Sequence, residues 1–303
     1  MSYSFLRESK LYIVYGSGAG IKYRIYTSTA ITFNQTFAEE SYSVKTLHDQ
    51  SKMFEGSNIT KANPASFSFD VPLTTQKDES IVLTLASDLS SSNTINSFDM
   101  YVQTGSSTFK LEGAVITSAS FDFLPENQFT MRVEGEGIKL TRAGDESFTI
   151  PGNAQSESAT RTPLIVYPTV TLNDGSAKNM AIILSVNLTI QNEMEWTPYE
   201  TLHDSLNSIT MFPSAHTVGK RIISGEIRQY QTDNNVAQFD DFSTNTSLTI
   251  TAKNVSGDAN FLEVEINPVM YTARMQPEEV YTQSYDFRSL DNTDPVSTQI
   301  TYS

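Results

Sequence analysis

Residues 115–139 read VITSASFDFLPENQFTMRVEGEGIK, and this stretch predicts a β-hairpin. Apolar and polar residues alternate on both sides of Pro125-Glu126-Asn127, which is the pattern of two strands joined by a turn. Phe121, Phe129 and Met131 fall on the apolar side, so one face of the hairpin packs on a core and the other is wet. The polar side consists of Ser120, Asp122, Thr130, Arg132, Glu134 and Glu136.

A second hairpin with the same signature follows 152 residues later. The turn Pro125-Glu126-x-x-Phe129-Thr130 recurs as Pro277-Glu278-x-x-Tyr281-Thr282. Apolar residues such as Tyr285 and Phe287 again alternate with polar ones, so we expect a second wet face. Its polar side consists of Thr272, Arg274, Thr282, Ser284, Asp286 and Arg288.

Three further words recur in the same order along the chain. They are Ile13-Val14-Tyr15 with Ile165-Val166-Tyr167, Thr46-Leu47-His48-Asp49 with Thr201-Leu202-His203-Asp204, and Met53-Phe54 with Met211-Phe212. Collinear matches displaced by about half the chain predict an internal duplication. Copy one takes residues 1–142, and copy two takes residues 163–303 with a polar tail from Asp291. Residues 143–162 between them have the Gly, Pro, Ser and Thr content typical of a linker.

The fold class predicted for the chain is mainly β, with two tandem β-sandwich or half-barrel domains that each carry one flanking α-helix. A helix is predicted around each Thr-Leu-His-Asp word, and in copy two Thr197, Pro198 and Glu200 form its capping signal. Leu47 and Leu202 are expected to be buried at matching places on these helices. The strands expected in copy one are Leu11–Tyr15, Ile21–Tyr26, one through Phe33 and Phe37, Phe67–Leu73, Ile81–Leu85, Phe98–Val102, Val115–Phe123 and Gln128–Lys139.

Composition limits the chemistry that the chain can perform. It has 35 acidic and 20 basic residues, a formal net charge of −15, which argues against binding nucleic acid by neutralising phosphates. It contains no cysteine and three histidines, so cysteine-based sites are excluded and histidine-rich metal sites are disfavoured. We therefore expect no enzyme activity, no cofactor and no bound metal.

The motifs that come nearest to a catalytic or ligand-binding site have a structural interpretation. Gly16-Ser17-Gly18-Ala19-Gly20 lacks the third glycine and the helix of a dinucleotide site, so a hairpin turn is expected there, as at Asn173-Asp174-Gly175. His48-Asp49 and His203-Asp204 are adjacent pairs, whose side chains point in different directions on a helix. His216 has no partner motif, and no catalytic residue is assigned.

Four segments of copy one carry a resemblance to a known family. They are Ser4–Arg7 with Leu11–Tyr15, Val44–Leu47 with Met53–Gly56, Ala62–Pro64 with Phe67–Phe69, and Phe109–Val115 through Phe121–Phe123 to Val133–Gly137. Together they resemble the major tail tube proteins of long-tailed bacteriophages, of the siphophage type with duplicated domains. Copy two matches only through the internal repeat, and its Tyr285-Asp286-Phe287-Arg288 lacks the glycines of the family pattern.

The resemblance implies a structural protein of the virion tail. In that family, rings of six domains stack into a hollow tube, so a chain with two domains needs three copies per ring. Their inner sheets join into a β-barrel, whose lumen conducts DNA into the host cell. The polar sides of the two hairpins are then expected to line the lumen, where acidic groups repel phosphate. Arg132, Arg274 and Arg288 are expected to pair with neighbouring carboxylates.

The partners implied are further copies of the chain, other tail proteins at the tube ends, and DNA in transit. The start MSYSFLRESK lacks the apolar core of a secretory signal, so we expect assembly in the host cytoplasm and no membrane insertion. The alternative is a tail-tip or baseplate component, or a carbohydrate-binding tandem β-sandwich with exposed Trp196 and Tyr199. Both aromatic residues, however, fall within the predicted helix of copy two.

Overall fold

The computed structural model is mainly β, as the alternation of residues predicted. It describes residues 9–16, 18, 20–44, 54–87, 95–124, 127–173, 177–196, 212–233, 246–254, 260–277, 279–289 and 300–302. Within these residues there is one helix, α1 (Ser80–Ser87). The strands are β1 (Lys10–Tyr15), β2 (Ile21–Ile25), β3 (Thr32–Asn34), β4 (Phe37–Val44), β5 (Phe54–Ala62), β6 (Ala65–Pro72), β7 (Phe98–Gln103), β8 (Ser107–Phe123), β9 (Thr130–Gly137), β10 (Lys139–Asp145), β11 (Asn153–Ala154), β12 (Val166–Asn173), β13 (Ala177–Asn179), β14 (Ile183–Trp196), β15 (His216–Tyr230), β16 (Thr246–Asn254), β17 (Asn260–Gln276), β18 (Thr282–Ser289) and β19 (Ile300–Tyr302).

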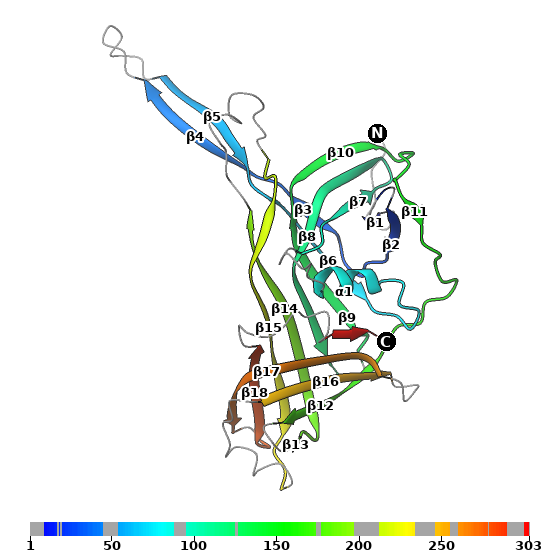
Figure 1. Cartoon of the computed structure of the whole chain (residues 1–303), viewed down its shortest axis with the longest axis vertical. Helices are drawn as coiled ribbons and strands as arrows, with labels where there is room; N and C mark the ends of the chain where they lie inside the picture. Colours follow the sequence, from blue (N-terminus) through cyan, green and yellow to red (C-terminus); the bar gives the residue numbers. More distant parts are fainter. Residues whose placement is uncertain are drawn as a thin grey trace.

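Strands from both halves of the chain form one continuous antiparallel sheet, which we call the long sheet (Figure 1). Its order is β3, β6, β9, the second part of β8 (residues 115–123), β14, β15, β18 and the second part of β17 (residues 269–276). The first four of these strands come from the first half of the chain and the last four from the second.

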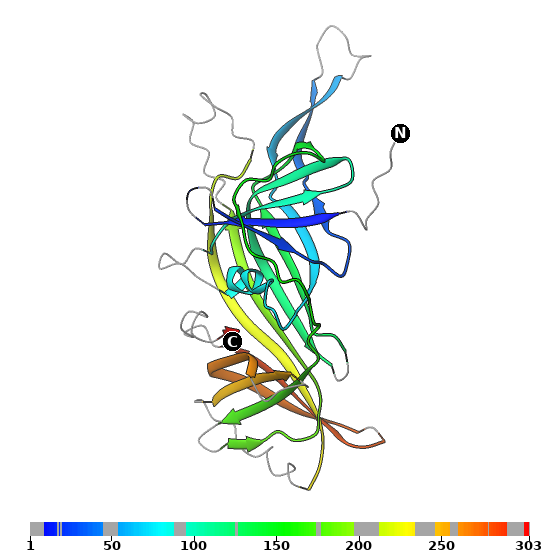
Figure 2. The ribbon, with the colours of Figure 1, turned by 90° about the vertical axis from the view of Figure 1, so that its right-hand side faces the viewer.

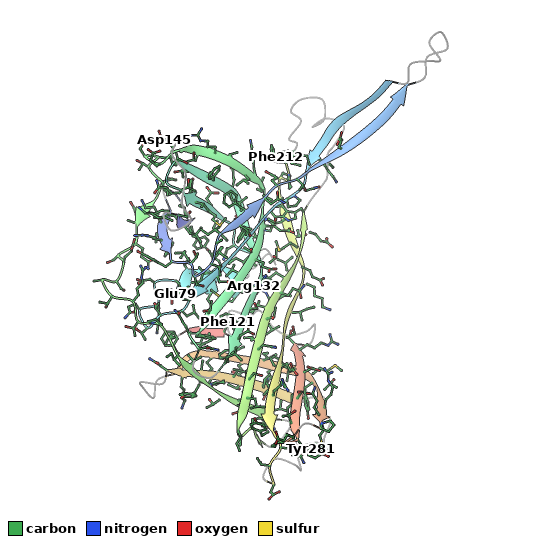
Figure 3. All side chains as sticks on the ribbon, turned by 180° about the vertical axis from the view of Figure 1, so that it is seen from behind. Glu79, Phe121, Arg132, Asp145, Phe212 and Tyr281 are labelled. Atoms are coloured by element: carbon green, nitrogen blue, oxygen red, sulfur yellow. The ribbon has the colours of Figure 1, made fainter. Side chains whose placement is uncertain are left out.

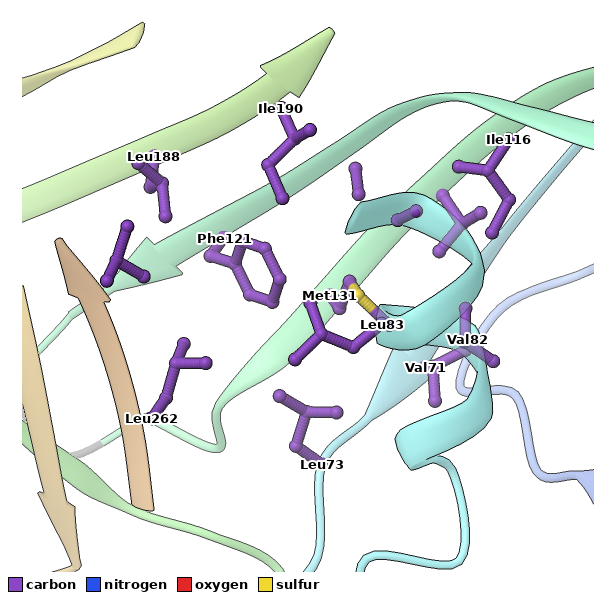
Figure 4. Packing of buried hydrophobic residues seen from close by; sticks show 14 of the residues in the cluster. Val71, Leu73, Val82, Leu83, Ile116, Phe121, Met131, Leu188, Ile190 and Leu262 are labelled. Atoms are coloured by element: carbon purple, nitrogen blue, oxygen red, sulfur yellow. The ribbon is translucent and has the colours of Figure 1, made fainter. Parts of the chain in front are cut away.

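A second layer of strands lies against the long sheet in each half (Figure 2). In the first half it consists of β11, β2, β1, β7, the first part of β8 (residues 107–114) and β10. In the second half it consists of β13, β12, β16, the first part of β17 (residues 260–269) and β19. Buried side chains of both layers, of both halves and of α1 form one apolar cluster (Figure 4).

Strands β8 and β17 each pass from one layer into the other. In β8 the change falls at Gly113, whose φ of 58° is a left-handed conformation that favours glycine, and at a register shift between Ile116 and Ser118. In β17 the irregularity falls at residues 266–269. Pro268 lies in this interval, where a bulge tolerates a residue without an amide hydrogen. Both strands therefore tie the layers together covalently.

The strand pairings of the first half occur again in the second half. The pairs β1–β2, β1–β7, β7–β8, β8–β9 and β8–β10 have the counterparts β12–β13, β12–β16, β16–β17, β17–β18 and β17–β19. β3 and β6 likewise have the counterparts β14 and β15, because β6 pairs with β9 and β15 pairs with β18. In the first half, β4 and β5 form an additional two-stranded arm that projects from the molecule (Figure 1).

The two halves meet where β8 pairs with β14. Residues 118–123 pair in antiparallel register with residues 186–191. On the core side of this junction, Phe121 is 1% exposed and Leu188 is 0% exposed. Burying side chains of this size stabilises the junction by about 1.5–3 kcal/mol each. The pairing is therefore part of the core and not a surface contact.

A polar contact connects α1 of the first half to β15 of the second. Arg221 donates hydrogen bonds to the carbonyl oxygens of Ser87 at 2.7 Å and Ala86 at 3.3 Å. The buried Asn192 of β14 donates to the carbonyl oxygen of Ile116 at 3.0 Å. The last carbonyl groups of a helix have no partner within the helix, so the guanidinium group caps α1 from the other half of the chain.

Helix α1 shows that the predicted strand at Ile81–Leu85 is wrong. Ile81, Val82, Leu83, Leu85 and Ala86 are all buried. A short helix in which Thr84 alone of residues 81–87 is exposed has nearly the same apolar pattern as a buried strand, so periodicity could not separate the two.

The two predicted helices fall mostly on residues that the structure does not describe. These residues include Leu47 and Leu202, so their burial stays a prediction. Val44 and Phe54, however, which flank the first Thr-Leu-His-Asp word, lie in β4 and β5 and not in a helix. Trp196, expected in the second helix, is instead the last residue of β14. Phe33 and Phe37, expected in one strand, lie in β3 and β4. Among the described residues, no helix is long and apolar enough to span a bilayer.

The remaining strand predictions are confirmed, with boundaries shifted by a few residues. The hairpins β1–β2, β8–β9 and β12–β13 form at the predicted turns. The predicted linker, residues 143–162, begins within β10 and contains β11, which pairs in parallel with β2. That segment therefore packs along the first half of the chain.

Two glycines of the long sheet make room for an aromatic ring on the neighbouring strand. Gly135 of β9 pairs with Phe67 of β6, whereas Gly225 of β15 pairs with Phe287 of β18. The first half thus has the phenylalanine on β6 and the glycine on β9, whereas the second half has the glycine on β15, the counterpart of β6, and the phenylalanine on β18, the counterpart of β9. A Cβ atom at Gly225 would lie 2.6 Å from the Phe287 ring and would overlap the backbone oxygen of Asn187.

Gly225→Ala is expected to lower the free energy of unfolding by about 2 kcal/mol or more, because the backbone of β14 cannot move away from the added methyl group. Gly219→Ala in the same strand is the matched control, since its Cβ would meet no atom closer than 3.6 Å. Chemical denaturation of both variants measures the difference. Equal stabilities would contradict the close approach of β14 and β15 at Gly225.

Candidate functional site

Two rows of polar side chains cross the long sheet, on the face opposite the apolar cluster. We call this surface the polar face, and its rows follow from register, because directly paired residues point to the same side of a sheet. The first row consists of Asp70, Arg132, Ser120, Thr189, Ser224 and Arg288, and it ends at the apolar Met270. The second row consists of Asp122, Asn187, Glu226, Asp286 and Thr272.

The polar sides of the two predicted hairpins both belong to the polar face (Figure 3 labels Arg132). The exposed members are Asp122, Arg132, Glu134, Thr272, Arg274 and Arg288, and the half-buried members are Ser120, Thr130, Glu136 and Asp286. The structure thus brings residues from two distant parts of the sequence onto one surface. Whether that surface lines a channel stays a prediction.

The expectation of a wet position is wrong for Thr282 and Ser284, which are both 0% exposed. Ser284 lies between Arg228 on β15 and Arg274 on β17. Long side chains on both neighbouring strands cover a short one between them, because side chains of directly paired residues lie side by side. The alternation within one strand contains no information about such neighbours.

Carboxylates neutralise two of the arginines on the polar face. Arg132 Nη2 lies 3.0 Å from Glu134 Oε1, and Arg274 forms an ion pair with Asp286. The pairing predicted for these two arginines is confirmed. Arg288 instead donates a hydrogen bond to a methionine sulfur at 3.8 Å. Exposed ion pairs add little stability, so their main effect here is on the charge of the surface.

A shallow groove of about 420 Å³ occupies the part of the polar face between β14 and β17. Its lining includes Asn187 and Thr189 of β14, Glu226 of β15 and Asp286 of β18. Sequence reasoning singled out only the last of these four. The alternation of β14, in which Asn187 and Thr189 separate buried aliphatic residues, could have revealed the first two. The groove is shallow and open to solvent, which suits a wall better than a ligand pocket.

The glycine-rich segment after β1 is a turn, as predicted. Gly16, Gly18 and Gly20 have φ values of 107°, 73° and 70°, which glycine adopts without strain. β1 and β2 pair on either side of this segment, from Tyr15 with Ile21 to Leu11 with Ile25. A strand follows the turn where a phosphate-binding site would need a helix.

The histidines form no catalytic pair within the described part of the chain. His216 packs against Trp196, with ring centroids 5.2 Å apart, and its Nε2 lies 3.3 Å from the carbonyl oxygen of Ile95. His48 and His203 lie outside the described residues. The described residues also contain no group of three or more His, Asp or Glu side chains that could hold a metal ion.

Tyr285 lies on the core side of β18, directly behind the polar face. Burial, together with a smaller effect of the neighbouring Tyr271, raises the pKa of Tyr285 to about 12. The Tyr285 hydroxyl donates a hydrogen bond to Gln283 Oε1 at 3.2 Å. The buried phenol is therefore held in its protonated form.

Stability should consequently fall at alkaline pH through Tyr285. Below pH ~10 the phenol is protonated in both the folded and the unfolded chain, so the contribution of the buried phenol to the free energy of unfolding is fully present. Between about pH 10 and 12 the unfolded chain releases the proton first, and the contribution is lost. The free energy of unfolding of the wild type should therefore fall more steeply in this window than that of Tyr285→Phe.

Tyr281→Phe is the control, because Tyr281 is 54% exposed at the β17–β18 turn (Figure 3). It should keep the wild-type pH dependence of the free energy of unfolding. Identical alkaline profiles for Tyr285→Phe and the wild type would contradict the burial of the Tyr285 hydroxyl.

The sequence matches a known protein family along its whole length. The profile of the Bacteriophage Baseplate Tube Protein Family matches residues 1–303. A search of curated proteins gave no match. The family match confirms the predicted class at a general level, a structural component of a phage tail. The family description names the baseplate tube, whereas the sequence resemblance had pointed to the major tail tube.

Proposed function

The chain belongs to the bacteriophage baseplate tube protein family, and on that basis we propose that three copies form a ring that contributes to a hollow tube. The polar face lines the channel of this tube, and DNA passes along it during ejection. The protein acts as a wall in this role, so it performs no chemistry on the DNA. Its partners are further copies of itself and other tail proteins.

The observation that carries the proposal is the continuity of the long sheet across both halves of the chain. β8 of the first half pairs with β14 of the second half in the way that two neighbouring ring subunits would pair. The repeated strand pairings and the repeated words of the sequence support an internal duplication. With two repeats per chain, three chains supply six repeats to a ring, since 3 × 2 = 6.

The charge of the polar face supports a channel for DNA. Asp122, Glu134 and Glu226 are carboxylates on this surface, and Arg132 and Arg274 are paired with carboxylates. Phosphate groups bind surfaces that offer rows of free cations, because such binding releases counterions. Three chains carry a formal charge of 3 × −15 = −45, which disfavours adhesion of DNA to the wall.

The carbohydrate-binding alternative receives no support from Trp196. Its indole is half-buried, packs on His216 and donates a hydrogen bond from Nε1 to Glu136 Oε2 at 2.5 Å. A sugar would need the exposed face of that ring. Tyr199, the other candidate, lies outside the described residues.

Native mass spectrometry tests the ring directly. The purified protein should give assemblies whose masses are multiples of three chains, each of 33.6 kDa. A closed symmetric ring contains a fixed number of chains, so the masses should increase by three chains at a time. An open chain of subunits would show no preferred number of chains. A monomer that persists at high concentration, or assemblies whose masses are not multiples of three chains, would contradict the proposal.

A charge-reversal variant tests the channel. Asp122 and Glu226 form no ion pair with another described residue, so Asp122→Lys with Glu226→Lys adds free cations to the polar face. Phage carrying both changes should assemble tails but eject DNA more slowly. The delay should be greatest at low salt, because ions screen the attraction.

The matched control is Glu112→Lys with Glu146→Lys, which changes the net charge equally on exposed residues of the other layer. This control should eject DNA at the wild-type rate. Equal ejection rates for the two double variants across a salt series, with tails intact, would show that the polar face does not line the channel.

A further inference from the structure

The long sheet has an open edge at each end. Residues 270–276 of β17 pair with β18 on one side and with no other described strand on the opposite side. β3 pairs with β6 on one side and with no other described strand on its opposite side. Unpaired strand edges expose a row of amide and carbonyl groups that can accept another strand.

Because the strand pairings of the first half recur in the second half, each open edge can be matched to a strand edge that is paired inside the chain. Arg132 of β9 pairs with Ser120 of β8. The residue 152 positions after Arg132 is Ser284 of β18, and it pairs with Arg274 of β17. Arg274 is therefore the counterpart of Ser120. The open edge of β17 corresponds to the edge of β8 that β14 occupies within the chain.

The same reasoning identifies the strand that would occupy this edge. Ser68 of β6 pairs with Glu134 and with Thr32 of β3. The residue 152 positions after Glu134 is Asp286, which pairs with Glu226 of β15, so Glu226 is the counterpart of Ser68. On its other side, Glu226 pairs with Asn187 of β14. Thr32 is therefore the counterpart of Asn187. The open edge of β3 corresponds to the edge of β14 that contacts β8.

We propose that the edge of β17 in one copy pairs with the edge of β3 in a second copy, in the register that β8 and β14 adopt within the chain. This inference rests on the proposed ring and defines its contact between chains. The register places the following pairs opposite each other: Gln276 with Thr32, Met275 with Phe33, Arg274 with Asn34, Ala273 with Gln35, and Thr272 with Thr36.

The side chains at this edge fit the proposed partner. Met275 is 44% exposed on the core side of β17, and its counterpart Phe121 is 1% exposed. Phe33, the residue opposite Met275, has the counterpart Leu188, which is 0% exposed. Pairing would thus bury an exposed methionine against an aromatic ring, at the position where the junction within the chain buries Phe121 against Leu188. It would also continue the polar face from Arg274 to the exposed Asn34.

Engineered cysteines test the register, because the chain contains no cysteine of its own. Asn34→Cys and Arg274→Cys in one chain lie on opposite edges of the long sheet, so a disulfide between them joins two chains. Paired Cα atoms lie about 4.5–5.5 Å apart, within reach of a disulfide. Mild oxidation of assembled protein should yield covalent dimers and trimers and no larger products.

The matched control is Asn34→Cys with Met270→Cys, which moves the second cysteine four residues along β17. That displacement is about 13 Å, too far for a disulfide. The covalent product of the first pair should exceed that of the control by ~10-fold or more. Rings that give no such excess would overturn the register while leaving the proposed function standing. A chain that forms no rings would overturn both.

Two exposed methionines on β17 provide an independent test. Met275→Glu places a charge where the two cores would meet, so the concentration needed for ring formation should rise ~100-fold or more. Met270→Glu is the control, because Met270 is 48% exposed on the polar face. Both variants should melt like the wild-type monomer. Unchanged ring formation by Met275→Glu would overturn the proposed contact.

Discussion

The antiparallel pairing of β8 with β14 is the constraint on which the rest of the structure depends. β8 lies between β9 and β14 in the long sheet and between β7 and β10 in the second layer, so it contacts four strands. Side chains in a strand alternate with a period of two, and a slip by one residue would exchange Ser120 with Phe121. The core and the polar face are therefore fixed by the same register.

The polar face has the properties of an inert wall more than those of a binding site. Its arginines are largely offset by carboxylates on the same or the neighbouring strand, and the described residues hold no cluster suited to a metal ion. A surface that long DNA passes over must keep attraction weak, because each phosphate held by a free cation adds to the drag. The family to which the chain belongs is consistent with such a structural role.

Much of the first half could be predicted from the sequence, because its strands have one dry and one wet side. The hairpin at residues 115–139 and the turn at Gly16–Gly20 follow from local patterns alone. Helix α1 could not be predicted, since nearly all of its residues are buried and the helical period is lost. The solvent-exposed position predicted for Ser284 is wrong, because the side chains of Arg228 and Arg274 on the neighbouring strands cover it. The β8–β14 junction depends on a pairing between distant segments, which no local pattern contains.

The most direct test is a cryo-microscopy map of the assembled tube. The long sheets of three chains are expected to form one continuous wall, with Arg132 and Asp286 facing the channel and α1 outside it. The positions of the two repeats around the ring should then be related by a rotation of about 60°, because six repeats close a circle. A map with the polar face on the outer wall, or with gaps between the sheets of neighbouring chains, would contradict this arrangement.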